Sequence, residues 1–212
     1  MLKDMKKNKK KVSKFKEVNE RLNAERLAKL GNSMILRWPV CFSNEEVDQL
    51  RAYADSFNEQ IAIGHNSSMH VNTKFRRSQG CAIPFDEFQW VYKRILDAAK
   101  EINKLYQFDI NGKSELAQLA IYDEADEGFY TWHSDTSPAH MTRKISISVP
   151  LSSPNEYEGG ALQFILDGEP KDIPQTRGGL ISFPSYEQHR VTPVTKGRRY
   201  SLVIWLSGPN WC

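Results

Sequence analysis

The chain has 212 residues, of which 40% are hydrophobic and 11% aromatic, so it is long enough to form one domain with a sizeable core. Its formal net charge is only +3, and eight lysines lie within residues 1–16, which leaves the remainder slightly acidic. This balance excludes a strongly basic nucleic-acid-binding domain, although the lysine-rich arm allows a weak contact with nucleic acid.

Three cysteines are scattered along the sequence at Cys41, Cys81 and Cys212. Their spacing fits neither a zinc site nor a disulfide framework. The sequence also contains no apolar run typical of a signal peptide or a membrane-spanning helix. We therefore expect a cytoplasmic protein without a membrane partner.

The first 30 residues differ in character from the rest of the chain. Residues 18–30 consist of helix-forming residues with an incomplete apolar stripe, and Gly31 is suited to end a helix there. We interpret residues 1–30 as a solvated basic arm followed by a packing helix, and residues 31–212 as the functional domain. The alternative is an arm that binds an acidic partner.

A strand and a helix are predicted next. Residues 34–40 form the strand, and Ser43 and Glu46 then have the spacing of a capping box, in which each side chain bonds the other residue's backbone. Apolar residues follow at helical spacing, at Val47, Leu50, Tyr53, Ala54 and Phe57.

Residues 60–64 and 70–83 are predicted to be extended. A longer helix is expected over residues 86–106, because apolar residues recur on one helical face, at Phe88, Val91, Ile95, Ala98, Ile102 and Leu105. We interpret this helix as part of the scaffold.

After residue 115 the pattern changes to short apolar or alternating runs separated by turn residues. These runs cover residues 116–122, 128–133, 143–151, 160–166, 179–183, 187–194 and 199–206. Many short strands at regular spacing indicate a β-sandwich or barrel. The predicted class is therefore α+β with a mainly β core, preceded by helices.

A metal-binding pattern lies inside the β region. His133 and Asp135 are two residues apart, which on a strand places both side chains on the same face. His189, on a later strand, supplies a second imidazole. Two histidines and one carboxylate are the set typical of a non-haem Fe(II) site with open coordination positions.

A candidate carboxylate-binding residue follows this set. We expect the chain to turn tightly at Lys196-Gly197 and to return through Arg199, with Ser201 on the same face of the returning strand. A guanidinium at a fixed distance from a metal binds the far carboxylate of a chelating keto acid through two parallel hydrogen bonds. Tyr122 is a further hydroxyl donor for that ligand.

These residues together resemble a known family, the 2-oxoglutarate- and Fe(II)-dependent dioxygenases of the prolyl 4-hydroxylase-like branch. The resemblance covers residues 115–207 and rests on several short segments in the same order as in the family. They are His133-Ser-Asp135, Glu158-Gly-Gly160, Phe183-Pro-Ser185, His189 to Val194 and Gly197-Arg-Arg199.

The resemblance implies a double-stranded β-helix, or jelly roll, and an enzyme that couples O2 and 2-oxoglutarate to hydroxylation, with ascorbate as a reductant. It implies that His133, Asp135 and His189 bind Fe(II) and that Arg199 binds the 2-oxoglutarate C5 carboxylate. Tyr122 and Ser201 are additional cosubstrate candidates. Asp135 favours hydroxylation over halogenation, because related halogenases have a small residue at that position.

The substrate is less well specified. Arg76 and Arg77 lie in a segment similar to one near the substrate entrance of prolyl hydroxylases, although those enzymes have Thr where this chain has Arg77. The nucleic-acid demethylases of the superfamily have an arginine where this chain has Trp205. We expect a prolyl residue of a peptide or an amino-acid-like small molecule as substrate. The alternative function is a non-catalytic metal-binding jelly roll that acts as a sensor or interaction module.

Overall fold

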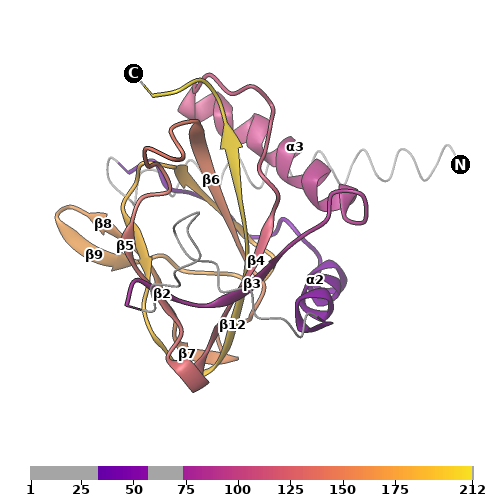
Figure 1. Cartoon of the computed structure of the whole chain (residues 1–212), viewed down its shortest axis with the longest axis vertical. Coiled ribbons are helices and arrows are strands. Elements are labelled where there is room, and N and C mark those ends of the chain that lie inside the picture. The colour runs from indigo at the N-terminus through magenta and orange to yellow at the C-terminus, as the bar shows by residue number, and fades with distance from the viewer. Residues whose placement is uncertain (1–32, 57–73, 212) are drawn as a thin grey trace, which may run out of the picture.

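A computed structural model describes residues 33–56 and 74–211 of the chain. In this part, two α-helices pack beside two antiparallel sheets (Figure 1). The arm and helix predicted for residues 1–30, and the extended piece predicted for residues 60–64, lie outside the described residues. Neither of the two described helices is long and apolar enough to cross a membrane.

Helix α2 (Asn44–Ser56) begins at the predicted capping box. The Glu46 N–H donates to Ser43 Oγ (3.3 Å), and the Ser43 N–H donates to Glu46 Oε2 (2.8 Å), so two amides at the helix start have acceptors. Helix α3 (Gln89–Tyr106) starts later than predicted, because residues 85–87 form a turn after Pro84.

The larger sheet has the strand order β1-β10-β6-β12-β4-β3, and β7 pairs with the start of β12. Its strands are β1 (Leu36–Trp38), β3 (Gln79–Ala82), β4 (Gln118–Asp123), β6 (Arg143–Pro150), β7 (Tyr157–Gly159), β10 (Leu180–Pro184) and β12 (Val194–Ser207). Every residue of β6 is buried, because the helices cover one face of this sheet and the smaller sheet covers the other.

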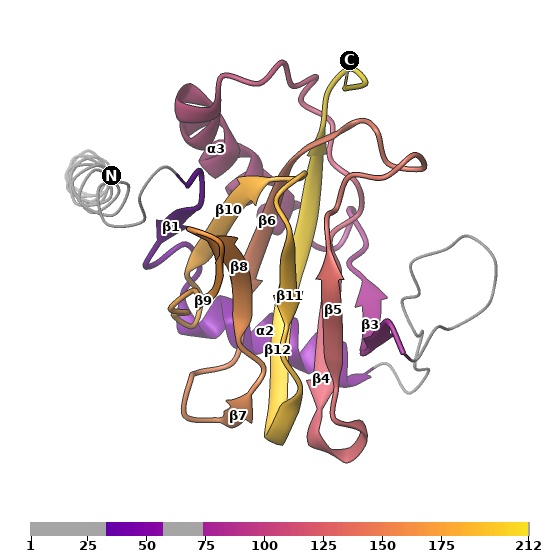
Figure 2. The ribbon, with the colours of Figure 1, turned by 90° about the vertical axis from the view of Figure 1, so that its left-hand side faces the viewer.

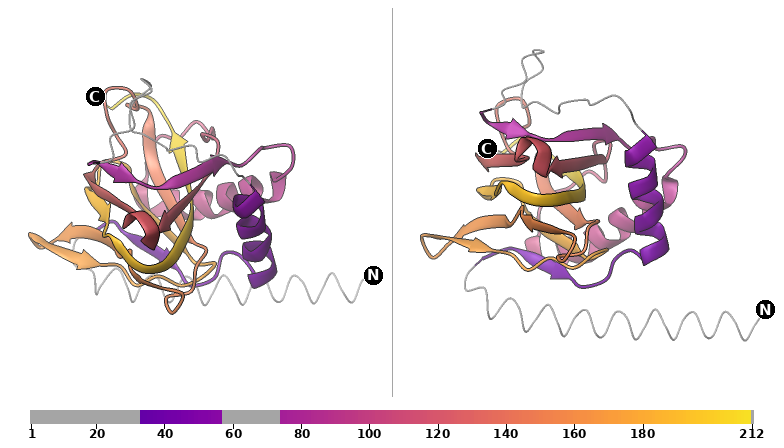
Figure 3. Two further views of the ribbon diagram at one scale, coloured as in Figure 1. Left: turned by 60° about the horizontal axis from the view of Figure 1, so that its bottom comes forward. Right: turned by 90° about the horizontal axis from the view of Figure 1, so that it is seen from below.

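The smaller sheet has the order β2-β5-β11-β8-β9. Its strands are β2 (Arg76–Arg77), β5 (Phe129–His133), β8 (Leu162–Leu166), β9 (Glu169–Asp172) and β11 (His189–Val191). Figure 2 shows the smaller sheet in front of the larger one. Seen from below, α2 and α3 lie on one side of the strands and the β8–β9 hairpin extends on the other (Figure 3). The predicted α+β, mainly β architecture is confirmed.

Successive side chains of β12 point alternately to the apolar core that includes the helices and to the pocket between the two sheets. Leu202 and Ile204 belong to the apolar cluster that includes the helices, whereas Arg199 and Ser201 face the pocket between the sheets. The apolar packing of the helices therefore fixes which β12 side chains point inward.

The predicted tight turn at Lys196-Gly197 is wrong. Strand β12 continues through both residues, and Gly197 adopts φ +74° within it. The chain instead passes from the smaller sheet to the larger one between β11 and β12, at Thr192 and Pro193. His189 and Arg199 consequently lie on different sheets and not on one hairpin.

Two strands, β7 and β9, were not predicted from the sequence, for different reasons. A Cβ atom at Gly159, the last residue of β7, would lie 2.1 Å from Pro193 O, so the backbone contact requires glycine there. This glycine makes the β7 sequence look like a turn. All four residues of β9 are exposed, so this strand has no apolar alternation.

Candidate metal centre and adjoining pocket

Three candidate metal-binding residues lie close together at the end of β5 and the start of β11 in the smaller sheet. His133 ends β5 and is paired directly with His189, the first residue of β11. Ligand atoms of both histidines and of Asp135 all lie within 4.8 Å of one another, and the three residues are buried. Among the described residues, no other group of His, Cys, Asp or Glu is placed to hold a metal ion.

Backbone carbonyls orient both imidazole rings. His133 Nδ1 is 2.8 Å from Thr131 O, and His189 Nδ1 is 2.9 Å from Glu187 O. Because a carbonyl oxygen only accepts, each Nδ1 carries the proton and each Nε2 keeps its lone pair for a metal. Burial and the neighbouring His189 lower the pKa of His133 below its usual value, which favours the neutral ring.

The carboxylate lies between the two imidazoles, with Asp135 oxygens 3.8 Å from each Nε2. Burial alone would raise the pKa of Asp135, but the two histidines and a hydrogen bond from Ser146 Oγ (2.6 Å) lower it below its usual value. The donor set of two imidazole nitrogens and one carboxylate oxygen fits Fe(II).

Arg199 is 2% exposed and lines the pocket beside these ligands. Its Nη1 donates to Ser201 Oγ (3.3 Å) and its Nη2 to Gln175 Oε1 (3.0 Å), but its buried Nε has no acceptor among the described residues. A buried N–H without an acceptor is costly. The carboxylate of a ligand in this pocket would supply the missing acceptor, so the site also fits 2-oxoglutarate.

The neighbours of Arg199 shape this end of the pocket. Tyr122 is its register partner on β4, and the Tyr122 ring centroid lies 5.3 Å from the guanidinium carbon. A Cβ atom at Gly160 would lie 3.0 Å from Arg199 Cδ, so glycine leaves room for the arginine stem.

The two arginines of β2 have different surroundings. Arg76 lines the pocket, with its guanidinium carbon 4.5 Å from the Tyr130 ring centroid and its Nε donating to Ser78 Oγ (2.6 Å). Arg77 is not among the pocket residues; its guanidinium lies over Phe129 and within 3.8 Å of Glu127. Alternation along a strand accounts for this difference.

Four residues of the site were not identified from the sequence as part of it. They are Tyr130, whose ring stacks on His133 (centroids 3.5 Å apart), Ser146, Gln175 and Trp205. Strict alternation turns Tyr130 away from His133, but a register shift between β11 and β5 turns both inward. The alternating Ile and Ser residues of β6 were the available signal for Ser146.

Comparisons with known proteins agree with this geometry. Residues 117–207 match the family model described as the 2OG-Fe(II) oxygenase superfamily. The chain is 28% identical over 180 residues to a PKHD-type hydroxylase of Shewanella sp. (strain MR-7), covering 82% of this chain and 78% of that protein.

Two solved structures share the fold. A Pseudomonas putida prolyl-4-hydroxylase has a TM-score of 0.68 at 21% identity, covering 88% of this chain and 98% of that one. A Trichoplax adhaerens prolyl hydroxylase in complex with a peptide fragment of the hypoxia-inducible factor oxygen degradation domain has a TM-score of 0.68 at 19% identity, covering 91% of each chain. The predicted jelly roll is therefore confirmed.

Replacing Ser146 with Ala is expected to weaken Fe(II) binding by about 10- to 100-fold, because Asp135 loses the hydroxyl that orients its carboxylate. Anaerobic calorimetric titration measures this affinity. Ser148→Ala is the matched control, since Ser148 lines the same pocket from the same strand without a hydrogen bond to Asp135. Equal losses in the two variants would contradict the role of Ser146.

Proposed function

Because the chain belongs to the 2OG-Fe(II) oxygenase superfamily, we propose that it is an Fe(II)- and 2-oxoglutarate-dependent dioxygenase that hydroxylates a C–H bond. The observation that carries this proposal is that the cluster of His133, Asp135 and His189 shares one pocket with the buried guanidinium of Arg199. A metal site alone has many uses, whereas this combination suits a chelating keto acid with a second carboxylate.

In this proposal His133, Asp135 and His189 would hold Fe(II). The Nε, Nη1 and Nη2 groups of the Arg199 guanidinium would bind the C5 carboxylate, with Ser201 and Tyr122 beside them. When bound, Fe(II) and 2-oxoglutarate supply the oxidation, in which O2 yields succinate, CO2 and the hydroxylated substrate. Ascorbate would keep the metal reduced between turnovers.

The buried surroundings of the ligands support this chemistry. The carbonyls of Thr131 and Glu187 hold both ring protons away from the metal, so the imidazoles bind without losing a proton. Aromatic rings pack against the histidines, Tyr130 on His133 and Phe164 on His189. They limit water access at the ligands and strengthen the electrostatic interactions there.

We further propose that Arg76 contacts the substrate. The charged side chains of the pocket are Arg76, Asp135 and Arg199, and the charges of Fe(II) and the 2-oxoglutarate dianion cancel, which leaves one positive charge. Arg76 therefore suits an oxygen-rich, negatively polarised group, such as the carboxylate of an amino-acid-like molecule or the carbonyls around a prolyl residue. Prolyl hydroxylases share the fold, one of them in complex with a peptide.

Oxygen consumption coupled to succinate release tests the proposed activity. The wild-type protein with Fe(II) and 2-oxoglutarate is expected to form one succinate per O2 consumed, faster with a substrate from a panel of amino acids and prolyl peptides. Asp135→Ala is expected to abolish both signals, because it removes one of three ligands. A wild type that binds Fe(II) but consumes no O2 would instead favour a non-catalytic sensor or interaction module.

Replacing Arg76 with Ala is expected to raise the KM for the substrate about tenfold or more, since a charge-assisted hydrogen bond is lost. Slow succinate release without substrate is expected to stay unchanged. Arg77→Ala on the same strand is the control, because Arg77 lies outside the pocket. Steady-state kinetics with the best substrate of the panel measure the effect, and similar KM values for both variants would contradict it.

A further inference from the structure

Arg199 lies where β12 has a regular strand partner on only one side. The ladder between β12 and β6 begins at Ser201 opposite Pro150, and beyond this pair a single backbone bond continues it, from the Leu151 N–H to the Tyr200 carbonyl (2.9 Å). Nearer the start of β12, pairing with β7 extends only to Gly197. Residues 198–200 are therefore in register with β4 alone.

Ser152 fills this gap with its side chain. Its Oγ accepts a hydrogen bond from the Tyr200 N–H (2.9 Å) and donates one to the Arg198 carbonyl (3.2 Å). Ser152 is only 1% exposed, so water does not readily replace the hydroxyl. One hydroxyl thus holds the backbone immediately before and after Arg199.

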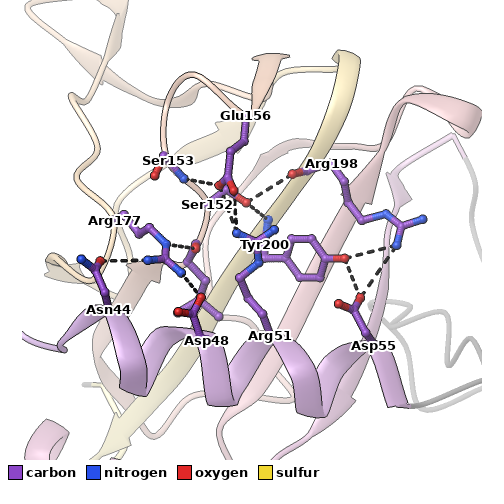
Figure 4. A network of polar contacts seen from close by, with 11 residues as sticks. Asn44, Asp48, Arg51, Asp55, Ser152, Ser153, Glu156, Arg177, Arg198 and Tyr200 are labelled. Atoms are coloured by element: carbon purple, nitrogen blue, oxygen red, sulfur yellow. Dashed lines mark hydrogen bonds and ion pairs between the residues drawn. The ribbon is translucent and has the colours of Figure 1, made fainter.

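The side chains of Arg198 and Tyr200 point to the opposite face of β12 from Arg199 and reach helix α2. The Tyr200 hydroxyl donates to Asp55 Oδ1 (2.6 Å) near the end of α2 and accepts from Arg198 Nη1 (3.2 Å). Arg198 Nε also donates to Asp123 Oδ2 (2.5 Å) on β4. Figure 4 shows Asp55 projecting from α2 towards Tyr200 and Arg198.

Helix α2 is also tied to the loop that carries Ser152. The Arg51 guanidinium lies over the Tyr200 ring, 4.8 Å from its centroid, and Arg51 Nη1 donates to Glu156 Oε1 (2.8 Å). Glu156 in turn accepts from the Ser153 N–H (2.5 Å). The helix, the loop and β12 are therefore linked on the outside of the sheet (Figure 4). Arg199 projects from the opposite face of β12.

We propose that Ser152, Arg198, Tyr200 and Asp55, the outer clamp, position Arg199 and so set the preference of the pocket for 2-oxoglutarate over a 2-oxo acid without a C5 carboxylate. This inference rests on the proposed function. Bidentate carboxylate binding requires a guanidinium at a fixed distance from the metal, so a small backbone displacement at Arg199 weakens it. The residues of the outer clamp are positioning residues, because none of them lines the pocket.

A role in stability alone does not explain the ion pair between Asp55 and Arg198 in the outer clamp. The Asp55 and Arg198 side chains are 52% and 48% exposed, and surface ion pairs contribute little to stability. Their contact with Tyr200, directly beside Arg199, is the feature that sets them apart from other surface pairs.

The test compares binding of 2-oxoglutarate and pyruvate to the Mn(II)-loaded protein by calorimetry. Pyruvate has the same chelating keto-acid end but lacks the C5 carboxylate. Ser152→Ala and Tyr200→Phe are each expected to weaken 2-oxoglutarate binding by about three- to tenfold and to leave pyruvate and Mn(II) binding unchanged. Thermal unfolding of each variant verifies that it is folded.

Asp48→Asn is the matched control. Asp48 lies on the same helix and pairs with Arg177, but it contacts none of residues 198–200, so the control is expected to bind both acids as the wild type does. Unchanged 2-oxoglutarate affinity in both clamp variants, or equal weakening of both acids, would overturn the positioning role. A wild type that binds the two acids equally well would instead overturn the assignment of Arg199 in the proposed function.

Discussion

The direct pairing of His133 with His189 across β5 and β11 is the interaction on which the geometry of the site depends. It places the two ring centroids 4.1 Å apart, and Asp135, two residues further along the chain, completes the ligand set. The register shift beside this pair turns Tyr130 inward as well, so its ring supports the first imidazole. A slip of one residue in either strand would point a ligand out of the site.

The second half of the site comes from the other sheet. Alternation along β12 presents Arg199 to the pocket while Leu202 and Ile204 pack towards the helices. The distance between the three candidate metal ligands and Arg199 is thus set by the packing of two sheets, and not by a local turn. This arrangement gives α2 a role in the site although it contributes no pocket residue, because its polar face holds the outer side of β12.

Much of the fold and the chemistry was predictable because it depends on local patterns. The spacing of His133 and Asp135, the capping box at Ser43 and the short strands after residue 115 all follow from side-chain periodicity. The wrong turn at Lys196-Gly197 and the unrecognised place of Tyr130 in the site involve bulges and a crossover between sheets, which depend on how distant strands pair. Ser152 could not be found from the sequence, since its importance follows from hydrogen bonds to a distant strand, at the Tyr200 N–H and the Arg198 carbonyl.

The most direct test of the central claim is anaerobic addition of 2-oxoglutarate to the Fe(II)-loaded protein, followed by visible absorption spectroscopy. If the three ligands hold Fe(II) beside Arg199, chelation by the keto acid produces a weak metal-to-ligand charge-transfer band, and succinate, which lacks the 2-oxo group, produces none. A folded, Fe(II)-binding protein that shows no band with 2-oxoglutarate would contradict the claim.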